Sequence, residues 1–193
     1  MIKQSKMMGL LAFFFLIAFA ACDDDNDDNG MPDPGASSYS FSVTGDMEFD
    51  ADGQVFFAAY YDPEFEEDIF LLNMMPEDEE TDMNLMFIKG GSQPGTNTYP
   101  IVYHDEVEAG EFLEDAFVSR FNVTVEENDM PTIYFFEAEE GSITFEESGS
   151  DRVAGHFSYH ATGYNVMEED NELHIEISGT FDAAYADPGD PDF

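Results

Sequence analysis

The fold class is decided by VAGHFSYHA at residues 153–161 and LHIEISGTF at residues 173–181. In both segments apolar residues or glycine alternate with polar ones, which is the period of a β-strand with one buried and one solvated face. Gly155 and Gly179 occupy inward positions, where a missing side chain admits a neighbouring aromatic ring or a close strand. The C-terminal third therefore predicts long antiparallel strands.

The same alternation continues back to Tyr39, with Gly, Pro, Asn and Asp punctuating the runs. Tyr39, Phe41 and Val43 alternate with polar residues, and the Asp52-Gly53 pair predicts a hairpin turn before an apolar run at 54–61. Residues 131–138 are apolar on both sides, which predicts a central strand covered on both faces. Residues 39–186 are thus expected to form one mainly β domain. A single antiparallel β-sandwich is the first expectation, and a closed, lipocalin-like β-barrel is the alternative, since 20 Phe and 9 Tyr could fill a core or line a cavity.

Residues 1–30 predict the destination of the chain. Lys3 and Lys6 precede an apolar run at 7–21 that is too short for a transmembrane helix, so residues 1–21 are interpreted as a signal peptide. The run ends in Phe19-Ala20-Ala21-Cys22, which resembles the lipobox of bacterial lipoproteins and implies lipidation of Cys22. Residues 22–38 then form a lipidated acidic tether, and residues 187–193, rich in Pro and Asp, are expected to be a disordered tail.

The acidic run after Cys22 resembles the export signal of surface lipoproteins of the Bacteroidota. The strand patterns G-x-I-x-F, V-x-G-x-F-x-Y and I-x-I-x-G-x-F between Gly141 and Phe181 are similar to those of small β-rich surface lipoproteins of the same phylum. The resemblance implies a lipid-anchored protein of the outer membrane, exposed on the cell surface. It implies an antiparallel β domain and no particular chemistry.

Charge excludes one class of partner. The chain has 44 acidic and 5 basic residues, and Lys3 and Lys6 leave with the signal peptide, so the mature chain carries 41 net negative charges. Phosphates would be repelled, and a nucleic-acid partner is excluded. Salt screens such self-repulsion, which favours a halophilic or marine source.

Metal and catalytic motifs are incomplete. Asp25, Asp27 and Asn29 match the first half of a calcium loop, but Ala36 stands where the bidentate Glu belongs, so weak Ca²⁺ binding is the most that this segment predicts. His156, His160 and His174 are interpreted as solvated surface residues, with a two-histidine metal site as the rival. The chain has no G-x-S-x-G motif, and its single cysteine is assigned to lipid, so no nucleophile can be nominated.

These observations predict a non-catalytic binding or structural module with a protein or glycan partner and no cofactor. Two alternatives stay open. One is an extracellular carbohydrate-active hydrolase that uses carboxylates, and the other is a barrel that carries a small apolar ligand.

Overall fold

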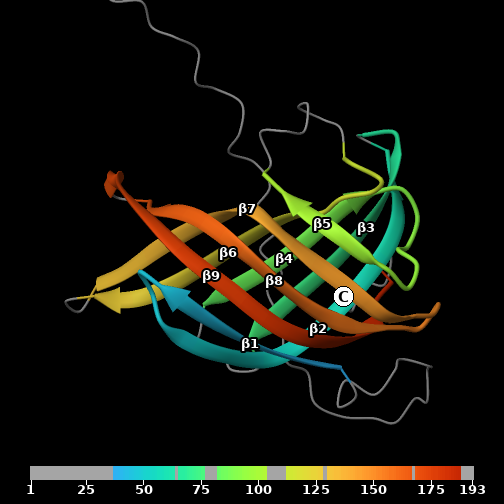
Figure 1. Cartoon of the computed structure of the whole chain (residues 1–193), viewed down its shortest axis with the longest axis horizontal. Helices are drawn as coiled ribbons and strands as arrows, with labels where there is room; N and C mark the ends of the chain where they lie inside the picture. The colour runs from blue at the N-terminus through green and yellow to red at the C-terminus, as the bar shows by residue number, and fades with distance from the viewer. Residues whose placement is uncertain are drawn as a thin grey trace, which may run out of the picture. The chain divides into compact units, whose positions relative to one another are not determined.

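The computed structural model is built of strands joined by turns and loops, and its described part contains no helix (Figure 1). It describes residues 37–63, 65–76, 82–103, 112–127, 130–166 and 168–187. The strands are β1 (Ser38–Gly45), β2 (Phe49–Asp62), β3 (Glu67–Pro76), β4 (Met83–Gly90), β5 (Thr98–Val102), β6 (Val118–Glu127), β7 (Met130–Ser148), β8 (Arg152–Asn165) and β9 (Glu168–Tyr185).

Several predictions from the sequence fall outside these residues. They are the signal peptide, Cys22, the tether as far as residue 36, and nearly all of the tail. The calcium candidates Asp25, Asp27 and Asn29 also lie there. In the described residues, no helix is long and apolar enough to cross a membrane.

The strands close into a ring in the order β7-β6-β4-β3-β2-β1-β9-β8, and β8 pairs back to β7. The result is an eight-stranded antiparallel barrel, with β5 added alongside β7 where β6 diverges from it. Figure 1 shows β8 and β9, in orange and red, passing in front of the green strands β3 and β4 of the opposite wall. The mainly β prediction is confirmed.

The sandwich prediction is wrong, and the closed barrel is observed. Closure depends on β1, which pairs with β2 along one edge and with β9 along the other. Phe41 of β1, for example, lies opposite Ala51 of β2 and Gly179 of β9. Beyond the start of β1, strands β2 and β9 pair directly, with Phe56 opposite Ala184. Both architectures have strands with one wet face, so the alternation alone could not separate them.

Aromatic rings fill the barrel interior. Phe41 of β1 and Phe121 of β6 lie on opposite sides of the ring, yet their centroids are 5.9 Å apart. Rings from β4 and β8 also meet across the interior, since Phe87 and Phe157 have centroids 4.9 Å apart. Most of these rings are less than 2% exposed. The interior is therefore a packed core at these levels, as expected for a barrel of eight strands.

Three strand predictions require correction. Asp52-Gly53 lies inside β2, opposite Ser40 and Tyr39, while the turn falls after Gly45, whose φ of 113° is a conformation that favours glycine. The two segments predicted at 131–138 and 141–145 form the single strand β7, interrupted by a bulge between Ala138 and Glu140. The outer face of β7 is not covered, because Ile133 is 49% exposed.

Candidate functional site

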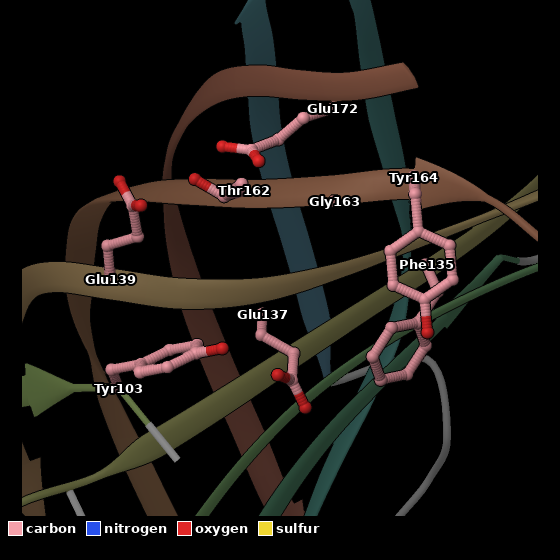
Figure 2. Close-up of a pocket in the computed structure, with 8 residues that line it drawn as sticks. All are labelled: Tyr103, Phe135, Glu137, Glu139, Thr162, Gly163, Tyr164 and Glu172. Atoms are coloured by element: carbon pink, nitrogen blue, oxygen red, sulfur yellow. The ribbon is translucent and has the colours of Figure 1, made fainter. Parts of the chain in front are cut away.

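A groove of about 460 Å³ lies on the outer face of the barrel, over β7, β8 and the start of β9 (Figure 2). We call it the β7–β8 groove. Its lining combines aromatic, carboxylate and hydroxyl side chains: Tyr103, Phe135, Glu137, Glu139, Thr162, Gly163, Tyr164 and Glu172.

Strand alternation brings these side chains to one face. Phe135 and Glu137 of β7 lie opposite Tyr164 and Thr162 of β8, so both pairs point outward while the residues between them point into the core. A Cβ added at Gly163 would lie 2.2 Å from the Phe135 carbonyl oxygen. The missing side chain therefore lets the two strands approach closely beneath the groove.

The bulge in β7 shapes one side of the groove. The shift of register between Ala138 and Glu140 leaves Glu139 as an extra residue, and both Glu139 and Glu140 are exposed. Bulges re-aim side chains and increase local twist. Glu139 also lines a second outer hollow, of about 460 Å³, whose lining includes His160 and Glu176. The two hollows share this residue, so they adjoin one another.

Aromatic side chains form part of the groove wall. The rings of Phe135 and Tyr164 have centroids 6.1 Å apart and an interplanar angle of 48°. Tyr164 is 39% exposed, so part of its surface is open to a ligand. Tyr103 follows β5 and brings a third ring from a distant part of the sequence (Figure 2).

The charged groups of the groove are mainly negative. Glu137 forms an ion pair with Arg120, with Nε and Oε1 3.8 Å apart. Glu172 lies 3.5 Å from the ring of His174, whose other nitrogen is 3.2 Å from the Thr162 hydroxyl. Figure 2 shows Glu172 pointing toward Thr162, whereas Glu137 points the other way. Three carboxylates thus share one groove with a single guanidinium beside them.

The ionisable groups most affected by burial lie elsewhere. Lys89 is the last inward residue of β4, and its ammonium donates to the carbonyls of Gly90 and Ser92. Burial lowers the pKa of Lys89, and nearby carboxylates, Glu114 foremost, partly oppose this shift. Burial also raises the pKa of Tyr159 inside the barrel, against a smaller opposing effect of the Ser119 hydroxyl. Neither side chain lines the groove.

The histidines lie where the sequence predicted, on the solvated faces of β8 and β9. His156 lies 3.4 Å from Glu146, and His160 lies opposite Glu140 and Glu176 on the neighbouring strands. Among the residues that the structure describes, no group of three His, Cys, Asp or Glu side chains could hold a metal ion.

Sequence reasoning did not nominate the groove residues. The pattern at residues 131–138 predicts that Phe135 is buried on a second face of its strand, and Tyr103 and Tyr164 belong to no motif. The available signal was the apolar Ile133 and Phe135 on the outward register of β7, in a chain whose other outward positions are mostly polar. Comparison of the chain with models of protein families, with curated proteins and with solved structures gives no significant match.

Proposed function

We propose that the chain is an exported lipoprotein of the outer membrane, anchored through Cys22 and displayed on the cell surface. Its barrel acts as a non-catalytic binding module for an extracellular glycan. The anchoring part of this proposal rests on the signal segment, the small residues before Cys22 and the acidic run after it.

The β7–β8 groove is the observation that supports a glycan as the ligand of the barrel. Sugars present apolar C–H faces and many hydroxyls, so their binding sites combine aromatic surface with a few polar groups. Phe135 and Tyr164 supply the aromatic surface, while Thr162 and three carboxylates supply polar groups. The packed interior does not favour the alternative of a barrel that carries a small apolar ligand, because rings such as Phe41 and Phe121 occupy the space that the ligand would need.

Binding is tested with an array of neutral and charged oligosaccharides and the mature lipoprotein in detergent. Tyr164→Ala should weaken the strongest interaction about 3- to 10-fold, the range expected for loss of a partly exposed aromatic contact. Tyr61→Ala is the matched control, because Tyr61 is also exposed, at 58%, but lies outside the groove. Equal effects of the two substitutions would remove the groove from the proposal.

The hydrolase alternative is tested on the same oligosaccharides. Three carboxylates in one groove are the observation that favours it, because glycoside hydrolysis uses a pair of them. Release of shorter sugars, abolished by a groove Glu→Gln substitution, would replace the non-catalytic assignment. Surface display is tested by adding protease to intact cells, and full protection of the domain would refute that part of the proposal.

A further inference from the structure

The groove lining restricts the chemistry of its ligand. Three carboxylates line the groove, those of Glu137, Glu139 and Glu172. An ionised carboxylate only accepts hydrogen bonds. The Thr162 hydroxyl already lies at hydrogen-bond distance from His174. A complementary ligand must therefore bring an excess of donors. Hydroxyl groups donate one hydrogen bond each, whereas a protonated amino group donates three and accepts none.

Charge points in the same direction. After the signal peptide the chain contains three basic residues, Lys89, Arg120 and Arg152. Arg152 pairs with Asp182, and Lys89 is buried against backbone carbonyls. Only Arg120 is close to the groove, and it already pairs with Glu137. Among the described residues Glu139 forms no ion pair, and Glu172 lies beside only the imidazole of His174, so an anionic sugar would be repelled and a cationic one attracted.

The aromatic side chains add to this preference. A cation over a Tyr or Phe ring gains about 0.5–1 kcal/mol at an exposed site. The exposed ring of Tyr164 lies opposite Phe135, next to the carboxylates, so one amino sugar could contact both kinds of group. The second hollow, which shares Glu139, adds Glu140 and Glu176 together with His160 and His174, and this additional surface suits a ligand of several sugar units.

We propose that the β7–β8 groove binds an oligosaccharide whose sugars carry free amino groups. This inference rests on the proposed glycan function and names its ligand class. The ammonium groups lie against Glu139 and Glu172, and the sugar rings lie against Tyr164 and Phe135.

The test compares two ligands that differ only in the amino group. Calorimetry measures binding of a glucosamine oligomer and of an N-acetylglucosamine oligomer of equal length to the mature lipoprotein in detergent. The buffer is slightly acidic, so that the free amino groups are protonated. We expect the free-amine oligomer to bind about tenfold more tightly at low salt. The difference should shrink in 1 M NaCl, where the Debye length is about 3 Å.

Two glutamates provide matched variants. Glu172 and Glu146 are both exposed, and each lies near a histidine, at 3.5 Å and 3.4 Å, but only Glu172 lines the groove. Glu172→Gln should weaken the free-amine oligomer about 2- to 5-fold, the upper part of the range for an exposed ion pair. Glu146→Gln should leave its affinity unchanged. Glu139→Gln, at the bulge, serves as a second groove variant, and thermal unfolding verifies that each variant is folded.

The remaining outcomes separate this inference from the proposed function. Equal affinity for both oligomers, with Tyr164→Ala weakening both, would keep the glycan function and overturn the amino-sugar inference. If neither oligomer bound while another oligosaccharide of the array did, the amino-sugar inference would be overturned and the glycan function kept. If no oligosaccharide and no spermidine bound, both would be overturned. Spermidine binding that depends on Glu172, without any sugar binding, would refute the glycan function and with it the inference. If Glu146→Gln weakened binding of the free-amine oligomer as much as Glu172→Gln does, the oligomer would be attracted to the acidic surface as a whole. That result would refute the groove assignment.

Discussion

The substitution Gly179→Ala tests the pairing between β1 and β9 that closes the barrel. A Cβ added at Gly179 would lie 2.4 Å from the Phe41 Cβ, 2.5 Å from the Ser40 carbonyl oxygen and 2.8 Å from the Phe41 Cα. The last two atoms belong to the backbone of β1, so a rotamer change cannot relieve the overlap. Strand β1 must move away from β9, or the core beneath must shift.

The expected loss follows from two opposing effects. Overpacking a well-packed core costs about 1–3 kcal/mol. Replacing glycine reduces the entropy of the unfolded chain and returns about 0.4–1 kcal/mol. A net loss of about 1.3 kcal/mol, from the middle of both ranges, should lower the Tm by about 3–5 °C for a domain of this size. Thermal unfolding of the mature lipoprotein, followed by circular dichroism, measures the shift.

Gly149→Ala is the control for this substitution. Gly149 lies in the turn between β7 and β8, and the nearest atom to an added Cβ, the Arg152 carbonyl oxygen, is 3.5 Å away. That is an ordinary contact, so the change in stability should stay within about 0.5 kcal/mol. An unchanged Tm for Gly179→Ala would refute the close approach of β1 to β9 and the closed barrel that depends on it. A similar loss for both variants would refute the steric explanation.

Three further predictions concern charge, alkaline pH and anchoring. The Tm should rise by several degrees between about 0.01 M and about 1 M NaCl, because the Debye length falls from about 30 Å to about 3 Å and screens the net negative charge of the mature chain. An equal rise with millimolar Ca²⁺ alone would indicate specific calcium sites instead. Burial raises the pKa of Tyr159 above its ordinary value of 10.0, so the native state keeps this proton while the unfolded state loses it, and stability falls as the pH rises above 10.0. Tyr159→Phe removes this contribution. The free energy of unfolding, measured with urea at two alkaline pH values, should therefore fall less steeply with pH in the variant than in the wild type, by up to about 1.4 kcal/mol per pH unit. Equal slopes for the two proteins would contradict the assignment to Tyr159. Cys22→Ser should abolish incorporation of labelled fatty acid and release the domain from the membrane fraction, whereas retention of the label would place the lipid elsewhere.

Local sequence patterns predicted the strands better than their closure. Alternation at residues 153–161 and 173–181 identified β8 and β9 and their buried faces, because a strand with one wet face needs that pattern in any architecture. Whether β9 then pairs with β1, far away in sequence, depends on the lengths, twist and bulges of all the strands together. The inward glycines were the local signal of close strand approach, as Gly155 and Gly179 both leave no room for a Cβ.

The groove was harder to predict because it depends on register. Phe135 meets Tyr164, 29 positions later, only through the pairing of β7 with β8, and Tyr103 arrives from a separate segment. The abundance of acidic residues also concealed the three glutamates, since almost every turn of this chain contains carboxylates. An apolar residue on the outward register of a strand was the informative feature, because such a residue is exposed unless another group covers it.

The barrel topology relates the groove to the expected membrane anchor. Strand β1 begins opposite the last part of β9, with Ser38 paired to Asp182. The first and last residues of the barrel therefore lie at the same end of it. The tether continues from β1 and is therefore connected there. Glu172 precedes Tyr185 by 13 residues of β9, which corresponds to about 40 Å along the strand. The groove therefore lies toward the end of the barrel remote from the start of β1. Deleting residues 31–36 should therefore reduce cleavage of the domain by protease added to intact cells but leave oligosaccharide affinity unchanged. A loss of affinity in the shortened lipoprotein, measured in vesicles, would mean that the groove faces the membrane.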